Sequence, residues 1–135
     1  MDEYDRLDIL INNAAVYLDG EFPSQTDMNK MRETFETNFF GPFVVIQAFL
    51  PLLKKSLHGR IVNVSSRMGS FGNQLPNRNK LAYSTSKAAL NMMTLPFYKE
   101  FCDKGWNTKI NSVNPGKYKD HLHTYVNLLF RISKN

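Results

Sequence analysis

Tyr83 and Lys87 lie four residues apart in the segment Tyr-Ser-Thr-Ser-Lys. Side chains with this spacing lie on one face of a helix, with their Cβ atoms about 5–6 Å apart. An ammonium group so close to a phenol stabilises the phenolate and lowers the phenol pKa from its usual value of about 10. The pair therefore indicates proton transfer near neutral pH. Taken alone, the same spacing is also typical of an exposed pair on a surface helix.

Polar and small residues follow three apolar runs of the chain. The run at residues 7–11 ends in Asn-Asn-Ala-Ala, the run at 60–64 ends in two serines, and a third run ends in Asn-Pro-Gly at 114–116. Short apolar runs of this kind predict buried strands. Ligands of open parallel sheets bind at the carboxyl ends of the strands. We therefore expect these three segments to meet at one edge of a sheet, near Tyr83.

The hydrophobic pattern predicts five elements in the order βαβαβ. They are the strand Leu7–Asn13, the helix Asp27–Lys55, the strand Arg60–Ser65, the helix Tyr83–Lys104 and the strand Lys109–Asn114. Right-handed crossovers would place both helices on the same face of a parallel sheet. The strands nevertheless carry apolar residues of both parities, which is typical of a sheet covered on both faces.

The tail at residues 117–135 has no counterpart in this pattern. Its apolar residues between Leu122 and Ile132 have near-helical spacing, so we expect a helical tail that covers the second face of the sheet. Without such a cover, the first strand leaves an open edge and the sheet leaves an apolar patch. Both features favour association with another chain.

In combination, these motifs resemble the short-chain dehydrogenase/reductase family over roughly residues 7–116, and most nearly its carbonyl-reductase-like members. The first polar segment resembles the Asn-Asn-Ala-Gly motif of that family, with Ala15 in place of glycine. A small side chain is tolerated there if the backbone does not need a positive φ. The resemblance implies an α/β fold with a Rossmann-like, doubly wound parallel sheet, of which three strands are recognisable. Residues 1–116 would form its carboxyl-terminal portion.

The resemblance also implies a site for hydride transfer between NAD or NADP and a carbonyl or alcohol substrate. Tyr83 would be the general acid and base, and Ser66, rather than Ser65, would bind the substrate oxygen. Lys87 would lower the pKa of Tyr83 and bind the nicotinamide ribose, and Asn38 would hold a water linked to Lys87. The cofactor-binding residues that it implies are Asn12, Asn13, Ala14, Tyr83, Lys87, Pro115 and Gly116.

The glycine-rich turn that brings backbone N–H groups to a dinucleotide pyrophosphate is missing from these 135 residues. None of the 7 glycines belongs to a Gly-x-x-x-Gly-x-Gly or Gly-x-Gly-x-x-Gly segment. We therefore expect that the chain lacks the amino-terminal, cofactor-binding half of the family domain. By itself it should bind cofactor poorly and show little or no activity.

Two alternatives to an oxidoreductase remain open at the level of sequence. In the family, the helix that corresponds to residues 31–53 often packs against its counterpart in another subunit, so the chain could be a non-catalytic module that pairs with itself or with an intact relative. Packing of the same apolar side chains into the core of this chain is the other reading of that helix. An isomerase or lyase of the same superfamily would keep Tyr83 and Lys87 but would also need the nicotinamide.

Composition excludes several other classes of protein. A chain of 135 residues with 42% hydrophobic content can bury one modest core. The single Cys102 fits a reducing compartment, and the acidic first residues do not resemble a secretory signal, so we expect a cytoplasmic protein. The uncharged stretch Thr37–Leu53 is shorter than the ~20 residues of a membrane span, so no membrane partner is expected. The spacing of His121 and His123 does not predict a metal site, because no acidic or cysteine cluster accompanies them.

The charge distribution is uneven along the chain. Residues 1–36 carry 9 acidic and 3 basic side chains, whereas residues 37–135 carry 3 acidic and 14 basic ones. The basic side chains are dispersed and are not interleaved with aromatic residues, so we expect no nucleic-acid partner.

Overall fold

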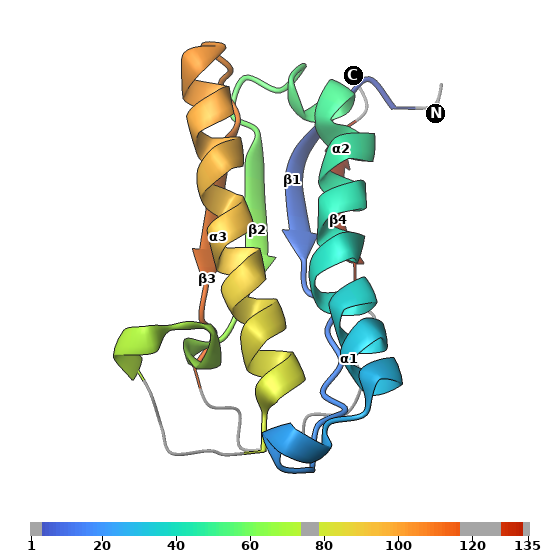
Figure 1. The fold of residues 1–135 in the computed structure, drawn as a ribbon. Coiled ribbons are helices and arrows are strands. Elements are labelled where there is room, and N and C mark those ends of the chain that lie inside the picture. The colour runs from blue at the N-terminus through green and yellow to red at the C-terminus, as the bar shows by residue number, and fades with distance from the viewer. Residues whose placement is uncertain (1–3, 74–78, 117–127, 134–135) are drawn as a thin grey trace.

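A computed structural model describes residues 4–73, 79–116 and 128–133. It contains a four-stranded sheet with the strand order β3-β2-β1-β4 (Figure 1). The strands β1 (Arg6–Asn12), β2 (Arg60–Val64) and β3 (Lys109–Val113) are parallel, and β4 (Leu128–Ser133) is antiparallel to β1. The predicted α/β fold with three parallel strands is therefore confirmed.

The first predicted helix is present as a helical segment with a π turn in its middle. The α-helix α1 (Met28–Phe35) runs into a π turn at Glu36–Phe40 and then into α2 (Gly41–Leu53). Asp27 caps the amino terminus, because its Oδ1 accepts a hydrogen bond of 2.8 Å from the backbone N–H of Asn29. π turns insert one residue into a helix and shift the side chains that follow.

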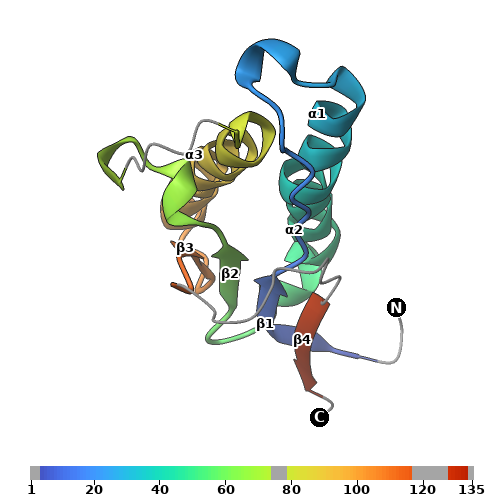
Figure 2. The same cartoon turned by 90° about the horizontal axis from the view of Figure 1, so that it is seen from below.

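The second predicted helix is α3 (Leu81–Asp103), and short 3₁₀ turns at Pro23–Gln25, Arg67–Gly69 and Phe71–Asn73 complete the fold. Both helical segments lie on the same side of the sheet, as the prediction required (Figure 2). Burial of apolar side chains between the helices and the sheet stabilises the fold by roughly 1.5–3 kcal/mol for each large side chain. The core consists of Leu7, Leu10, Ile46, Leu53, Ile61, Leu90, Met93, Phe101 and Ile110.

The opposite face of the sheet has no helix on it among the described residues. Leu10, Ile61 and Ile110 are register partners on the helix side and are almost fully buried. Side chains alternate between the two faces along a strand. Their neighbours on the other face, such as Val62, are only half-buried, and Val113 is 38% exposed.

The expectation of a helical tail over this face is wrong for residues 128–133. They form β4, which pairs with the edge of β1 from Arg6 opposite Ser133 to Asn12 opposite Leu128. The physical reason is that β1 presents a row of unpaired backbone N–H and C=O groups, which a short apolar segment can satisfy as a strand. Periodicity does not distinguish a strand from a helix in so short a run. Residues 117–127, with His121 and His123, lie outside the described residues.

The helical segment Met28–Leu53 is also long and apolar enough to cross a membrane, judged by length and composition alone. A core helix in a globular α/β fold passes the same test. In this fold Ile46 and Leu53 of the segment are fully buried in the core beneath the sheet. Of its most apolar 18-residue window, 28% is buried inside the described structure.

Candidate active site

The predicted site residues lie at the edge of the sheet formed by the carboxyl ends of the parallel strands. The amino terminus of α3 lies at this same edge, next to the segments that follow β1 and β2 (Figure 1). Ser66 directly follows β2, and Tyr83 lies in the first turn of α3. The fold therefore brings together side chains that are 17 positions apart in the sequence.

Tyr83 is half-buried, and its surroundings raise the pKa of its phenol above the usual 10.0. Burial is the main cause, and a side-chain hydrogen bond with Ser66 opposes it. The predicted lowering of this pKa by Lys87 is wrong for this arrangement. The Lys87 Nζ atom lies 5.7 Å from the centroid of the Tyr83 ring, and it is hydrogen-bonded elsewhere, so burial dominates.

Lys87 is 2% exposed, and its Nζ donates a hydrogen bond of 2.8 Å to the carbonyl oxygen of Val64. Burial lowers the pKa of this ammonium group from 10.5 to about 8. Most of the Lys87 side chains are therefore still charged at neutral pH. The last carbonyl of β2 thus holds a buried cation beneath the phenol of Tyr83.

The two serines that follow β2 have different surroundings. Ser66 is hydrogen-bonded to Tyr83, and its Oγ also accepts from the N–H of Met68 at 3.2 Å. The Oγ of Ser65 is buried and donates to the carbonyl of Lys87 at 3.4 Å. Of the two serines, Ser66 is the one that influences the Tyr83 phenol, whereas Ser65 is buried against the carbonyl of Lys87.

Gly69 allows the turn after Ser66 to lie directly on α3. A Cβ atom at Gly69 would lie 2.6 Å from the carbonyl carbon of Lys87 and 2.8 Å from the backbone nitrogen of Ala88. The carbonyl oxygen of Gly69 also accepts a hydrogen bond of 3.2 Å from Asn91. Backbone atoms cannot move aside as a flexible side chain can, so only glycine fits at this contact.

We expect Gly69→Ala to destabilise the protein by about 1–3 kcal/mol, because the added methyl group forces the turn away from α3. Gly72→Ala is the matched control, since its nearest atom would be the Oγ of Ser70 at 3.9 Å. That change should alter stability by less than about 0.5 kcal/mol. Urea unfolding of both variants measures the difference. Equal effects of the two substitutions would contradict the close packing at Gly69.

Asn38 lies in the π turn and is fully buried. Its Oδ1 accepts from the N–H of Val16 at 2.8 Å, and its Nδ2 donates to the Val16 carbonyl at 2.9 Å and to the Ser86 Oγ at 3.0 Å. The Ser86 hydroxyl in turn donates to the carbonyl of Tyr83 at 2.8 Å. Asn38 therefore ties the segment after β1 to α3. These contacts already use both amide hydrogens of Asn38. They do not test its role in holding a water near Lys87, which stays a prediction.

The polar segment after β1 begins inside the core. Asn12 is 2% exposed and donates a hydrogen bond of 2.8 Å from its Nδ2 to the Asn63 Oδ1, while its own Oδ1 has no partner among the described residues. Asn13 and Ala14 follow it and are partly buried. No described residue other than glycine has a positive φ. Ala15 therefore meets the condition under which alanine can replace the glycine of the motif.

The last predicted segment, Pro115-Gly116, follows β3 and is exposed. Gly116 has a φ of +86°, which favours glycine, and its N–H donates to the Asn114 Oδ1 at 3.2 Å. No described contact joins these two residues to Tyr83 or Lys87.

Sequence reasoning missed two residues of this edge, Tyr17 and Asp19. The rings of Tyr17 and Tyr83 meet edge to face, with centroids 5.5 Å apart. The carboxylate of Asp19 accepts hydrogen bonds from the backbone N–H groups of Ala82 and Tyr83. Both residues lie in a loop, where no periodicity marks them, and their contacts with α3 span more than 60 positions of sequence.

The residues present fit one end of a nicotinamide dinucleotide. Lys87 uses one of its three N–H donors on Val64 within the described part of the chain. This cation and the hydroxyl groups of Tyr83 and Ser66 are donors and acceptors of the kind that a nicotinamide ribose requires. No glycine-rich turn is available in these 135 residues for the pyrophosphate. The described residues likewise contain no group of three or more His, Cys, Asp or Glu side chains placed to hold a metal ion.

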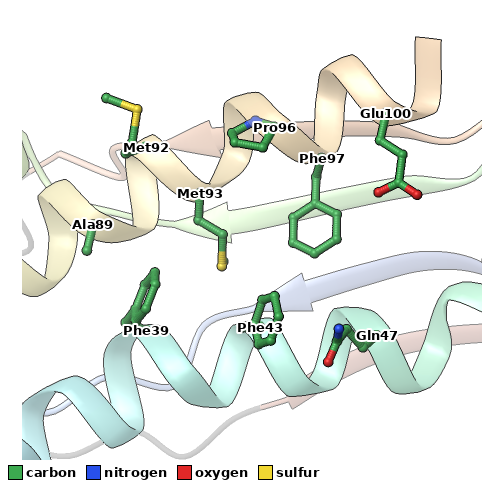
Figure 3. Close-up of a pocket in the computed structure, with 9 residues that line it drawn as sticks. All are labelled: Phe39, Phe43, Gln47, Ala89, Met92, Met93, Pro96, Phe97 and Glu100. Carbon is green, nitrogen blue, oxygen red and sulfur yellow. The ribbon is translucent and has the colours of Figure 1, made fainter. Parts of the chain in front are cut away.

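An apolar groove of about 570 Å³ lies between α3 on one side and the π turn and α2 on the other (Figure 3). The rings of Phe39 and Phe43 face Met93 and Phe97 across it. Met92, in the lining of the groove, is 65% exposed, and Val44 on α2 is 59% exposed. The prediction of core packing for this helix therefore holds for Ile46, which is fully buried, whereas part of its apolar surface remains open.

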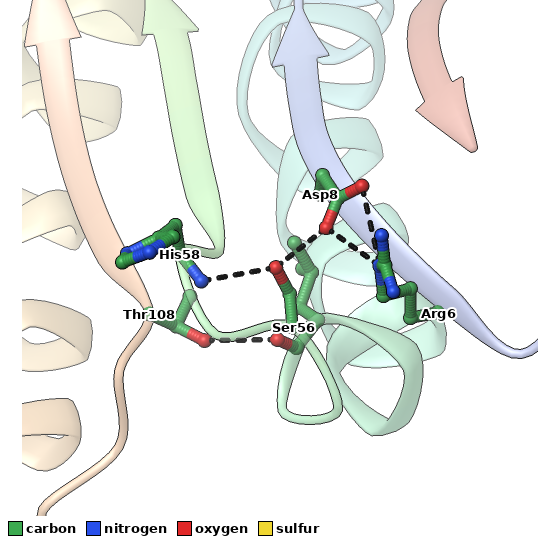
Figure 4. Close-up of polar contacts among 6 residues, drawn as sticks. Arg6, Asp8, Ser56, His58 and Thr108 are labelled. Atoms are coloured by element: carbon green, nitrogen blue, oxygen red, sulfur yellow. Dashed lines mark hydrogen bonds and ion pairs between the residues drawn. The ribbon is translucent and has the colours of Figure 1, made fainter. Parts of the chain in front are cut away.

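A second polar cluster lies at the opposite end of the strands (Figure 4). Ser56 donates to the Asp8 Oδ1 at 2.7 Å, and Arg6 pairs with the same carboxylate at 3.1 Å. The Ser56 Oγ accepts from the His58 N–H at 3.2 Å, and the Thr108 hydroxyl donates to the carbonyl of Leu53 at 3.3 Å. These contacts close the turn between α2 and β2, so the cluster has a structural role.

Known proteins are similar to this chain in sequence. The sequence matches the family model of short chain dehydrogenases over residues 1–127. Estradiol 17-beta-dehydrogenase 2 of Mus musculus is 40% identical over 116 residues, which cover 84% of this chain and 28% of that protein. L-fucose dehydrogenase of Rattus norvegicus is 29% identical over 113 residues, which cover 84% of this chain and 39% of that protein. The chain thus spans well under half the length of these curated relatives.

Solved structures show the same similarity. The NADPH-bound carbonyl reductase from chicken fatty liver superposes with a TM-score of 0.74 and 29% identity, over 86% of this chain and 52% of that one. A putative short chain dehydrogenase from Escherichia coli CFT073, complexed with NADPH, gives a TM-score of 0.75 and 33% identity, over 84% of this chain and 44% of that one.

Proposed function

This chain belongs to the short chain dehydrogenase family of oxidoreductases, and from that premise we propose that it carries the proton-transfer part of an NAD(P)-dependent site. The reaction would be hydride transfer between a nicotinamide and a small carbonyl or alcohol substrate. The observation that supports this proposal is that the Tyr83 ring centroid lies 5.7 Å from the Nζ atom of the buried Lys87, while the Tyr83 phenol interacts with the Ser66 hydroxyl. We further propose residues 1–116 as the carboxyl-terminal portion of such a domain, in the cytoplasm.

The described side chains would divide the work as follows. Tyr83 would give a proton to the carbonyl oxygen in reduction, and Ser66 would donate a hydrogen bond to the same oxygen. Lys87 would hold the ribose hydroxyls of the cofactor, with Asn38 maintaining the position of α3 beside it. The bound nicotinamide would supply or accept the hydride.

The direction of the Tyr83 pKa shift bears on the direction of the reaction. Because burial raises this pKa above 10.0, the phenol is protonated at neutral pH. A protonated phenol is the form that reduction requires, whereas alcohol oxidation requires the phenolate. We therefore propose that the phenol is in the form needed for the chemical step of reduction at neutral pH, and that the rate of oxidation increases as the pH rises.

The described residues suit the nicotinamide ribose of the cofactor, so binding of that part can be tested directly. We expect reduced nicotinamide mononucleotide and NADPH to bind with similar, weak affinities, on the order of 1 mM, because the chain supplies ribose contacts but no pyrophosphate cradle. Calorimetric titration with both nucleotides and with NADH measures this, after light scattering has shown that the chain is folded and monodisperse. Absence of saturation with all three would overturn the proposal for this chain by itself.

A second candidate function is favoured by the groove between α2 and α3. Its exposed apolar lining is the surface through which a non-catalytic module would pair with a second copy or with an intact relative. Sedimentation of the same preparation separates the two candidates. A concentration-dependent dimer without nucleotide binding would favour the module, and nucleotide binding by a monomer would favour the oxidoreductase.

A further inference from the structure

We propose that Asp19 is a positioning residue for Tyr83, because its carboxylate fixes the first turn of α3, on which the phenol stands. The inference extends the proposed function. It rests on that function only for the claim that the position of Tyr83 affects proton transfer. The contact itself is independent of cofactor and substrate.

The amino terminus of α3 lacks a cap of its own. The first N–H groups of a helix have no partner within the helix, and a Ser, Thr, Asp or Asn side chain just before it usually accepts from them. Here the preceding residue is Lys80, whose side chain makes no capping hydrogen bond. Asp19 takes that place from a distant segment, since its Oδ1 accepts from the Ala82 N–H at 3.0 Å and its Oδ2 from the Tyr83 N–H at 2.7 Å.

Both carboxylate oxygens are therefore used on consecutive amides, one of which belongs to Tyr83. A negative charge at this position also interacts favourably with the dipole of the helix. Since α3 has 23 residues, its later turns would remain helical without this cap. Loss of Asp19 should therefore loosen only the turn that carries the phenol.

The loop that carries Asp19 is itself fixed at its start. Val16 is held through both its N–H and its carbonyl by Asn38, three positions before Asp19. Between them, the ring of Tyr17 lies against the ring of Tyr83 at an interplanar angle of 86°. The segment 16–19 thus connects the π turn to the first turn of α3. The hydrogen bonds from this segment to the first turn of α3 are those of Asp19.

A capping role alone predicts lower stability, whereas a positioning role also predicts a change at the phenol. Burial of Tyr83 raises its pKa above 10.0. Because Tyr83 stands on the first turn of α3, a shift of that turn should change how deeply the phenol is buried. We expect Asp19→Ala to lower the Tyr83 pKa towards the value of an exposed tyrosine. We also expect the amide exchange rates of Ala82 and Tyr83 to rise on the order of tenfold, the size typical for a lost cap.

The measurement uses the full chain labelled at the tyrosine Cζ carbons, with the Tyr83 signal assigned through Tyr83→Phe and titrated by NMR. Asp27→Ala is the matched control, because Asp27 caps α1 through the Asn29 N–H at 2.8 Å and has no described contact with Tyr83. That variant should lose stability but keep the wild-type titration of Tyr83. An unchanged Tyr83 titration in folded Asp19→Ala would overturn the proposal.

If Asp19→Ala does not fold, Asp19→Asn decides the question. A carboxamide oxygen can accept from only one of the two amides, while its NH₂ group faces the other. Faster exchange at one amide together with a lower Tyr83 pKa would support the positioning role, and a folded variant with both unchanged would overturn it. None of these readouts requires nucleotide or turnover, so absence of nucleotide binding would contradict the proposed function without affecting the result for Asp19.

Discussion

Tyr83→Phe is expected to slow carbonyl reduction by about 10²- to 10⁴-fold, the contribution typical of a positioned general acid. The substitution keeps the ring, which packs edge to face on Tyr17, and removes only the hydroxyl that is hydrogen-bonded to Ser66. The fold should therefore stay close to that of the wild type, and the affinity for reduced nicotinamide nucleotide should fall by no more than the contribution of one hydrogen bond, about 1 kcal/mol. The loss should appear in the rate of the chemical step.

Single-turnover reduction under saturating nucleotide isolates that step, even where steady-state turnover of this chain is slow. Tyr98→Phe is the matched control on the same helix, because Tyr98 is 54% exposed and lies far along α3 from Ser66. It should reduce substrate at the wild-type rate. A Tyr83→Phe protein that did so as well would remove Tyr83 from the proton-transfer role and leave the interaction module as the better reading.

The strands could be predicted almost to the residue because each is a short apolar run that ends in polar residues. Both predicted helices also begin and end within two residues of α1, α2 and α3. What failed was the tail, where Leu128–Ser133 pairs with β1 instead of forming a helix. The hydrogen-bonding needs of an open strand edge decide that conformation, and these are not visible in the tail itself.

In the candidate site, too, the features set by local spacing could be predicted from the sequence, whereas those set by contacts between distant segments could not. The spacing of Tyr83 and Lys87 placed them on one helix face, and the structure agrees. It did not show that Lys87 donates to the Val64 carbonyl, nor that burial of the Tyr83 phenol raises its pKa instead of lowering it. The π turn that carries Asn38 and the cap formed by Asp19 likewise depend on contacts between segments far apart in the sequence.

Lys87→Met should stabilise the protein at neutral pH, by a net amount of about 2 kcal/mol. The pKa of Lys87 falls from 10.5 to about 8 on folding because the ammonium is buried. That difference corresponds to a cost of about 3 kcal/mol for holding the charged form inside the protein. Methionine fills a similar volume without charge. The Val64 carbonyl loses its hydrogen-bond donor in this variant, and that loss offsets about 1 kcal/mol of the stabilisation.

The sign of the pH dependence follows from the lowered pKa. Below about 8 the folded protein bears the full cost of the charged Lys87, and as the pH rises from about 8 to 10.5 that cost disappears. The advantage of Lys87→Met should therefore shrink over this window, and near pH 10.5 the variant should be the less stable protein by its lost hydrogen bond. The raised pKa of Tyr83 costs stability at high pH in both proteins, so it largely cancels in their difference.

Urea unfolding of both proteins at neutral pH and near pH 10 measures this crossing. Lys99→Met is the matched control on α3, because Lys99 is exposed and pairs with Asp103 at 3.0 Å in solvent. Exposed pairs of this kind contribute less than about 1 kcal/mol, and no crossing is expected for the control. A Lys87→Met protein that is less stable than the wild type at both pH values would mean that the Val64 carbonyl and its surroundings fully compensate the buried charge. In that case the ammonium would not be held at a cost to stability, and the case for a cation kept in place for cofactor binding would lose its energetic support.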